Sequence, residues 1–197
     1  EMVSSSPLIG KEQSPRFRVK DEFDNVLAEN WIWPREDPVW RWETYMNPIL
    51  YFSPDCSKFV NATLRNCGII ETFSFPGLER IACKEYFVPE FTTKVTTTGH
   101  SIKYKHERNG FIDICTTDSE IWAIWDGATD WSVPDEERPY PTKNTIAVFD
   151  WNLNIKRTIK LDYNVLNLAY DETSNVLYLV AVSKSGDKYL GRIILGK

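Results

Sequence analysis

The residues with the most chemical potential lie between Asp126 and Lys143, a segment rich in acidic residues and proline. We single out Asp126, Asp130, Trp131 and Tyr140, because carboxylates beside large rings suit the binding of a sugar, a peptide or a protein. Exposed large rings usually have something to cover them. Three prolines stiffen the segment, which lowers the ordering cost of binding. We therefore expect these four residues to contact a ligand or partner.

Three other interpretations of this segment stay open. Its carboxylates could hold Ca²⁺ through oxygen ligands, but the alternating ligand spacing of an EF-hand loop is missing. A solvated acidic loop without a ligand is therefore the simpler interpretation of the charges. Trp131 could instead fold back onto a neighbouring sheet as a plug, and a completely buried ring would leave a partner nothing to touch.

The sequence lacks the common motifs of nucleophilic and metal-assisted catalysis, namely G-x-S-x-G, S-x-x-K with K-T-G, and H-E-x-x-H. Its two histidines, His100 and His106, lie in the threonine-rich, basic stretch 92–108, which we interpret as a linker without a site of its own. We predict no catalytic residue, no metal and no cofactor.

An enzyme remains the alternative to a binding module. In that case carboxylates such as Asp113, Asp118 or Asp126 would gather at the end of a sheet and cleave a glycoside. The two carboxyl groups of a glycosidase lie about 5 to 10 Å apart. A cleft lined by aromatic rings, with carboxylates at that spacing, would favour the enzyme.

Composition excludes several classes of protein. The chain has 197 residues and a formal net charge of −5, which argues against a nucleic-acid binder, because such proteins usually carry a basic face. Aromatic residues make up 14%, which excludes intrinsic disorder. No apolar run approaches the 18 residues or so that a transmembrane helix needs.

The four cysteines are Cys56, Cys67, Cys83 and Cys115, and none belongs to a C-x-x-C pair. A zinc site would need four ligands at short paired spacings. A chain of this length folds without disulfides, so we expect four free thiols, which pack as small apolar groups. Disulfide pairing, with three possible full connectivities, stays open.

The elements that must position these residues are strands. Long amphipathic helices are missing, and short segments alternate apolar and polar residues with turn residues between them. The segments are 58–64, 69–75, 110–116, 120–125, 145–150, 155–161, 165–170, 176–181 and 189–195. This pattern predicts an all-β sandwich, barrel or propeller.

An internal repeat favours the propeller. Asp55, Asp118 and Asp171 occupy the same place in three similar stretches, 63 and 53 residues apart. The second interval shortens to about 35 if 126–143 is an insertion, against about 40 to 50 residues in a propeller blade. We interpret these aspartates as turn formers, whose carboxylates accept hydrogen bonds from nearby backbone N–H groups.

Several motifs resemble a known family. The stretches 110–114, 117–125 and 146–151 are similar to the TolB-like six-bladed β-propeller lipoproteins of Bacteroides-type bacteria. The stretch 53–59 resembles their blade turn, with Cys56 where glycine is usual. The resemblance covers 49–195, and residues 1–48 only weakly. It implies export to the cell envelope, periplasm-facing or at the outer membrane, and a lipid anchor in the full-length protein; the family has no agreed activity.

We therefore predict an all-β chain made of β-propeller blades, with about three four-stranded antiparallel blades and a partial one. Residues 1–197 form a single partial domain, with a leading partial blade and Trp/Pro-rich loop in 1–48. The blades span 49–108, 109–162 with the insertion 126–143, and 163–197. Six blades need roughly 270 to 330 residues, so we expect a fragment of a six-bladed propeller, or two copies assembled face to face.

The predicted function is a non-catalytic binding or interaction scaffold of the bacterial cell envelope. The expected ligand is an unknown protein or a glycan.

Overall fold

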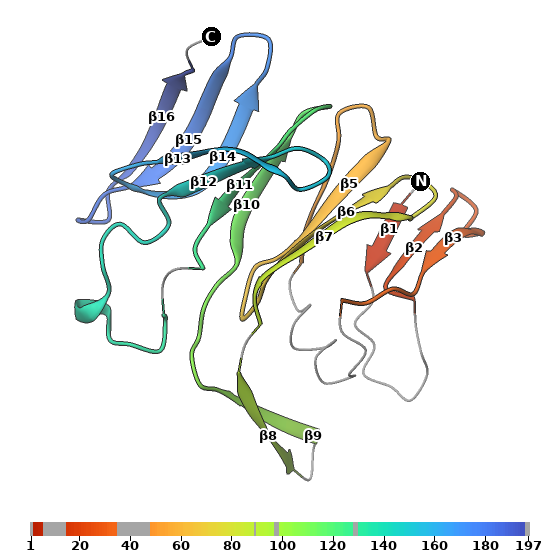
Figure 1. Cartoon of the computed structure of the whole chain (residues 1–197), viewed down its shortest axis with the longest axis horizontal. Helices are drawn as coiled ribbons and strands as arrows, with labels where there is room; N and C mark the ends of the chain where they lie inside the picture. The colour runs from red at the N-terminus through yellow and green to blue at the C-terminus, as the bar shows by residue number, and fades with distance from the viewer. Residues whose placement is uncertain are drawn as a thin grey trace.

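The computed structural model describes residues 2–5, 15–34, 48–88, 90–96, 99–127 and 130–195. In these residues it contains β-strands, one short 3₁₀-helix, η1 (Asp135–Glu137), and no α-helix. The strands form antiparallel sheets of two to four strands (Figure 1). The prediction of an all-β chain is confirmed.

Four sheets are meanders in which consecutive strands pair. The first contains β1 (Met2–Ser5), β2 (Phe17–Lys20) and β3 (Val26–Asn30), and the second contains β4 (Pro48–Phe52), β5 (Lys58–Thr63), β6 (Gly68–Ser74) and β7 (Arg80–Phe87). The third contains β10 (Phe111–Thr116), β11 (Ile121–Trp125), β12 (Thr145–Phe149) and β13 (Ile155–Lys160). The fourth contains β14 (Asn164–Asp171), β15 (Val176–Val182) and β16 (Lys188–Ile194).

These sheets are arranged as propeller blades. The first strands of three successive sheets lie side by side, with β10 in contact with both β4 and β14. The sheets therefore fan out from a common axis, as Figure 1 shows. The second and third sheets have the predicted four strands, whereas the fourth has three in the described part of the chain.

The stretch 92–108 departs from its interpretation as a linker. β8 (Phe91–Thr96) and β9 (Gly99–Tyr104) form a separate two-stranded hairpin between the second and third blades. The Trp/Pro-rich loop predicted near the N-terminus lies mostly outside the described residues, at 35–47.

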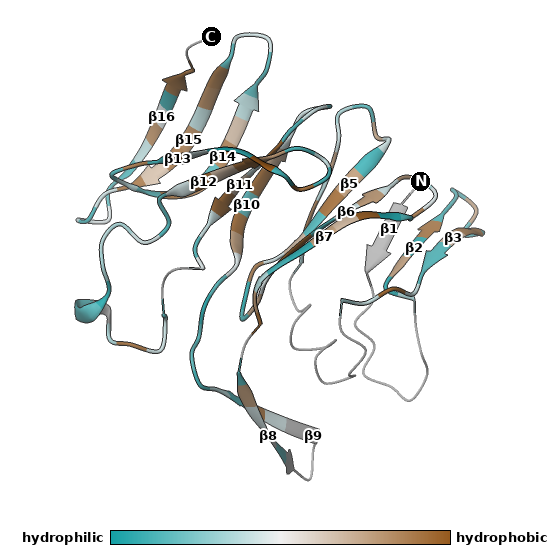
Figure 2. Ribbon diagram, in the orientation of Figure 1, coloured by the Kyte–Doolittle hydropathy of each residue, from teal (hydrophilic) through white to brown (hydrophobic). Residues whose placement is uncertain are grey.

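In the described residues, apolar layers fill the spaces between neighbouring blades. Figure 2 shows the apolar residues concentrated on the strands of the blades. In β11, Ile121 and Ala123 face the second blade, and Trp122 and Ile124 face the fourth, because successive side chains of a strand point to opposite faces. The central blade is therefore buried on both faces, and Phe17 and Val19 of β2 close the first layer.

Candidate functional site

The two ends of the blades differ in the length of their connections. At one end, the upper end in Figure 1, neighbouring strands are joined by short turns, at 21–25, 53–57, 75–79, 117–120, 150–154 and 172–175. The turns of neighbouring blades meet there, because Asp118 Oδ1 accepts a hydrogen bond from the N–H of Asp55 (3.2 Å). The opposite end, which we call the loop end, carries the long connections 88–110 and 126–144.

These two long connections are joined to each other at the loop end. His106 Nδ1 lies 2.6 Å from Asp130 Oδ2, and the N–H of Trp131 donates to the carbonyl of Glu107 (2.6 Å). Arg108 and Asp130 also form an isolated β-bridge. Two connections thus form one surface through residues that are 24 positions apart in the sequence, His106 and Asp130.

The Asp130 carboxylate is held in its charged form. The Ser132 hydroxyl donates to Asp130 Oδ1 (2.6 Å), and the Ser132 N–H donates to the same oxygen (3.0 Å). Together with His106, and led by the Ser132 hydroxyl, these bonds lower the pKa of Asp130 to about 2. The residue is therefore ionised throughout the physiological range.

Trp131 is half-buried, so the plug interpretation, which requires a completely buried ring, does not describe it. Its Nε1–H donates to Asp126 Oδ2 (3.1 Å). The Arg138 guanidinium lies 4.7 Å and Lys143 Nζ 5.0 Å from the ring centroid, both within cation–π range. These cations occupy ring surface on which a sugar would have to stack.

Asp126, one of the four residues expected to contact a ligand, lies below the surface in this structure. The residue is completely buried, and it accepts hydrogen bonds from Asn109 Nδ2 (2.9 Å) and from the Trp131 indole. A buried polar group must be hydrogen-bonded, and the bond between the carboxylate and the indole N–H holds the Trp131 ring in place. Asp126 is thus a positioning residue below the surface.

Tyr140 sits at the far end of the same connection and is attached to another blade. Its hydroxyl donates to the carbonyl of Val182 at the end of β15 (2.8 Å). Nearby, Asn164 Oδ1 accepts the N–H groups of Thr142 (2.7 Å) and Lys143 (2.9 Å). Asp126, Asp130 and Trp131 lie close together, whereas Tyr140 anchors the connection to the fourth blade.

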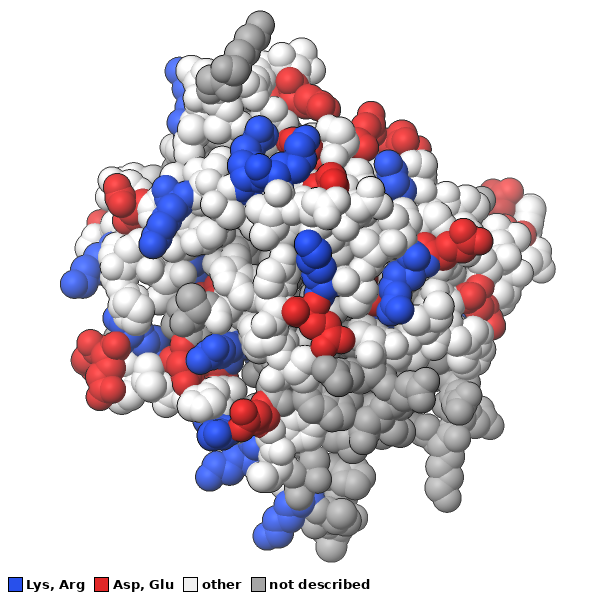
Figure 3. All heavy atoms as spheres, viewed as in Figure 1, with Lys and Arg blue, Asp and Glu red and all other residues white. Residues whose placement is uncertain are grey.

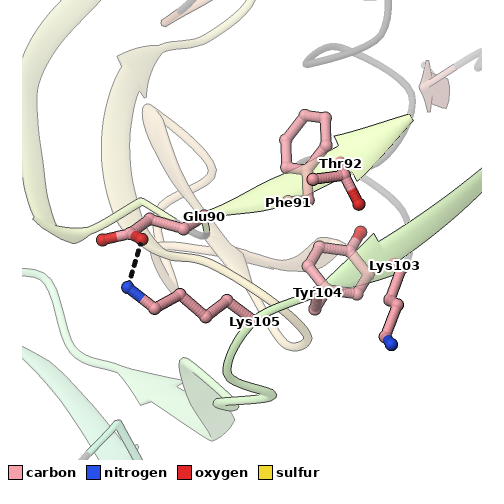
Figure 4. Close-up of a pocket in the computed structure, with 6 residues that line it drawn as sticks. All are labelled: Glu90, Phe91, Thr92, Lys103, Tyr104 and Lys105. Carbon is pink, nitrogen blue, oxygen red and sulfur yellow. Dashed lines mark hydrogen bonds and ion pairs between the residues drawn. The ribbon is translucent and has the colours of Figure 1, made fainter.

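Hairpin β8–β9 projects from the same end of the molecule (Figure 1). A hollow of about 370 Å³ at its base is lined by Glu90, Phe91, Thr92, Lys103, Tyr104 and Lys105 (Figure 4). Lys105 Nζ lies 2.9 Å from Glu90 Oε2 and lowers the pKa of that carboxyl. A smaller hollow of about 170 Å³ beside it is lined by Phe87, Val88, Glu90, His106 and Arg108.

The carboxylates named for the enzyme alternative do not gather. Asp118 and Asp126 lie at opposite ends of the β10–β11 hairpin, roughly 15 Å or more apart at the rise of a strand. Asp113 is nearly buried on β10, where its carboxylate accepts the Tyr51 hydroxyl (3.1 Å) and the N–H of Leu168 (3.0 Å). Through these hydrogen bonds, Asp113 links the second, third and fourth blades.

His106, Asp130 and Ser132 include the residue types of an acyl-transfer triad, but their order differs. In a triad the serine hydroxyl donates to the imidazole, which takes its proton. Here the Ser132 hydroxyl donates to the carboxylate, so the imidazole does not activate it. Among the described residues, no three His, Cys, Asp or Glu side chains are grouped to hold a metal ion, and no helix is long and apolar enough to cross a membrane.

His106 is the residue of this surface that sequence analysis missed. A lone histidine in a polar segment carries no local signal, since its partner Asp130 is distant in the sequence. The sequence of 92–108 is basic, but its composition does not distinguish a projecting hairpin from a linker.

No protein-family model matches the chain, and no curated protein sequence is significantly similar to it. Similar solved structures include a functionally unknown protein from Desulfotomaculum acetoxidans (14% identity, TM-score 0.45), the Dos1 propeller (13%, 0.37) and Sqt1 of Saccharomyces cerevisiae (9%, 0.34). The matches cover 93%, 75% and 88% of this chain but 50%, 36% and 53% of those chains. The chain thus spans about half or less of the length of these structures.

Proposed function

We propose that this chain is a non-catalytic interaction scaffold that binds a partner through its loop end. The observation that carries the proposal is the joining of the two long connections by His106 and Asp130. Binding residues are often found on loops that a rigid scaffold positions. Loops held in place before binding lose less entropy when the partner arrives.

A protein partner is favoured over a glycan. The Trp131 ring lies against Arg138 and Lys143, so the surface around it presents charge rather than an open aromatic platform. His106, Glu107 and Arg108 are exposed beside it. Charged, half-buried surfaces of this kind discriminate between partners by electrostatic complementarity.

The experiment selects binders from a displayed library of random peptides and maps where they bind. The loop-end variant Glu107→Lys/Glu137→Lys changes exposed charges on both connections. The matched variant Glu22→Lys/Glu172→Lys makes the same charge change at the turn end. The affinity of the selected peptides should change with the first variant, in the direction set by the charge of each peptide, and should stay the same with the second.

A change in peptide affinity with the turn-end variant only would overturn the proposal. So would turnover in a screen of chromogenic glycosides, esters and phosphates, if a single aspartate substitution abolished it. A glycan array with both variants tests the glycan alternative on the same surface.

We further propose a cell-envelope location with a lipid anchor in the full-length protein. The support is the resemblance of 49–195 to the TolB-like lipoproteins. Cells that express the full-length gene should yield the protein in the membrane fraction, released by detergent and not by high salt. Recovery in the cytosolic fraction would contradict this location.

A further inference from the structure

We propose that hairpin β8–β9 is a docking arm for an acidic, extended segment of a partner protein, which adds to the hairpin as a third strand. The proposal rests on the interaction scaffold proposed above and names the chemistry of its partner. We call the two strands, residues 91–96 and 99–104, the arm.

The arm pairs with no blade in the part of the chain that the structure describes. β8 and β9 pair along their length, from Phe91 opposite Tyr104 to Thr96 opposite Gly99. An isolated two-stranded sheet is marginally stable in water, and a third strand makes it markedly more stable. An edge strand also presents a row of backbone donors and acceptors to an incoming chain.

Charge favours an acidic partner. Residues 92–108 contain four Lys or Arg and one Glu, a formal net charge of +3, whereas the whole chain carries −5. The remaining residues therefore carry −8. Lys94 and Lys103 are exposed on the arm, and Lys and Arg side chains gather at the lower tip of the molecule in Figure 3, where Figure 1 places the arm.

The two faces of the arm differ in character. Thr92 is opposite Lys103 and Lys94 is opposite Ser101, so these four exposed residues share one face. Phe91, Ile102 and Tyr104 are half-buried on the other face, where the Phe91 and Tyr104 rings meet edge to face at 5.9 Å. A third strand that alternates acidic and apolar residues would place carboxylates beside the lysines and apolar groups beside the rings.

The base of the arm offers a second place for a carboxylate. Figure 4 shows Lys105 extending toward Glu90, and Lys103 extending to the other side of Tyr104. The side chains of Glu90 and Lys105 are 72% and 64% exposed, so their ion pair is weak and open to exchange. A partner carboxylate can replace Glu90 at Lys105.

Single-stranded nucleic acid is the competing ligand, since lysines interleaved with aromatic rings also suit it. The acidic body disfavours it, because a long polyanion would extend from the short arm over residues that carry −8 in total. A short acidic segment within a protein avoids that repulsion.

The test measures binding of a short fluorescein-labelled peptide of alternating Glu and Val, by anisotropy at low salt. A Lys-Val peptide and a short oligothymidylate are the comparison probes. The arm variant is Lys94→Glu/Lys103→Glu, and the matched control is Lys184→Glu/Lys188→Glu, which makes the same charge change at exposed positions of the β15–β16 hairpin. Thermal unfolding confirms that both variants fold.

We expect the Glu-Val peptide to bind to the original protein. The arm variant should raise the Kd of this peptide by about tenfold, because it reverses two exposed charges that would face the peptide. The control should stay within about twofold of the original protein. Amide hydrogen exchange at 91–104 should slow on binding, because a third strand protects edge amides.

Three results would overturn the proposal: no binding of the Glu-Val peptide, equal weakening in the control, or tighter binding of the oligothymidylate. If the arm fails this test, peptides from the random library whose binding depends on Glu107 and Glu137 would still support the scaffold function. Failure of the arm and failure of the scaffold are thus separable.

Discussion

Asp130 Oδ2 lies 2.6 Å from His106 Nδ1, and this contact joins two long connections that leave different strands of the propeller. One connection carries the basic arm, and the other carries Trp131 and the acidic turn at η1. The pair therefore fixes the position of oppositely charged segments on one surface. Its loss should separate the segments without unfolding the blades.

The first prediction concerns pH. The pKa of Asp130 is lowered to about 2, mainly by the Ser132 hydroxyl and further by His106. A lowered carboxyl pKa means that the contact is present above the unfolded value of 3.8 and is lost as the pH falls toward 2. Hydrogen exchange at 105–109 should increase in that window.

Asp130→Asn should remove this pH step, and Asp162→Asn, at an exposed position, should leave it unchanged. A step in the same pH window that survives Asp130→Asn would contradict the assignment, since it would come from another group.

The second prediction concerns the buried ion pair between the first two blades. The Glu71 carboxylate is completely buried and accepts hydrogen bonds from both Nη atoms of Arg16, with Nη1 at 2.9 Å from Oε1. Arg80 Nη1 lies 3.4 Å from the same oxygen. Glu71→Ala removes the carboxylate from beside two guanidinium groups and should cost about 3–5 kcal/mol.

The matched control is Glu29→Ala, because the side chains of the Glu29–Arg18 pair (2.8 Å) keep 29% and 37% of their surface in solvent, whereas Glu71 keeps none. It should cost about 0–1 kcal/mol. Urea unfolding of both variants measures the difference, and equal losses would show that the buried pair is not a link between the blades.

The third prediction concerns Gly110, where the third blade begins. A Cβ there would lie 2.3 Å from the carbonyl oxygens of both Thr63 and Cys67. The Gly110 N–H donates to the carbonyl of Leu64 (2.9 Å), so the backbone cannot move away without breaking this bond. Gly110→Ala should therefore destabilise by about 1–3 kcal/mol.

Gly191→Ala is the control, since nothing lies within 4 Å of a Cβ built there. It should change the stability by no more than about 0.5 kcal/mol. Thermal unfolding decides the comparison. A Gly110→Ala variant as stable as Gly191→Ala would mean that the second and third blades can move apart at this point.

Strand positions could be predicted from the sequence because burial follows local pattern. The segment 120–125 was expected as a strand and forms β11. Two of the repeated aspartates act as expected, since Asp55 Oδ1 accepts the Ser57 N–H and Asp171 Oδ1 accepts the Thr173 N–H. Asp118 Oδ1 instead accepts a hydrogen bond from the N–H of Asp55 in the neighbouring blade.

The candidate surface was only partly predictable, because its contacts join distant segments. Residue type points to Asp130 and Trp131, and both lie at the loop end. Asp126 has the same chemistry but is buried beneath Trp131, which local sequence does not reveal. The role of His106 depends on the docking of two connections, and no spacing rule encodes it.

The last prediction concerns the cysteines, which the structure carries as four free thiols. Burial raises the pKa of Cys67 and Cys115 to about 12 and that of Cys83 to about 11. A raised pKa keeps a thiol protonated, and only the thiolate is nucleophilic. Cys56 is exposed in the 53–57 turn, so iodoacetamide should modify it first in the folded protein.

Mass spectrometry of the folded protein should show one fast adduct, absent from Cys56→Ser. The unfolded, unreduced protein should show four adducts, because the other thiols react once water and base reach them. Two adducts or none after unfolding would mean disulfide bonds. Fast modification of Cys67 in the folded protein would instead mean that the cluster it forms with Ile69 opens readily, since burial is what protects its thiol.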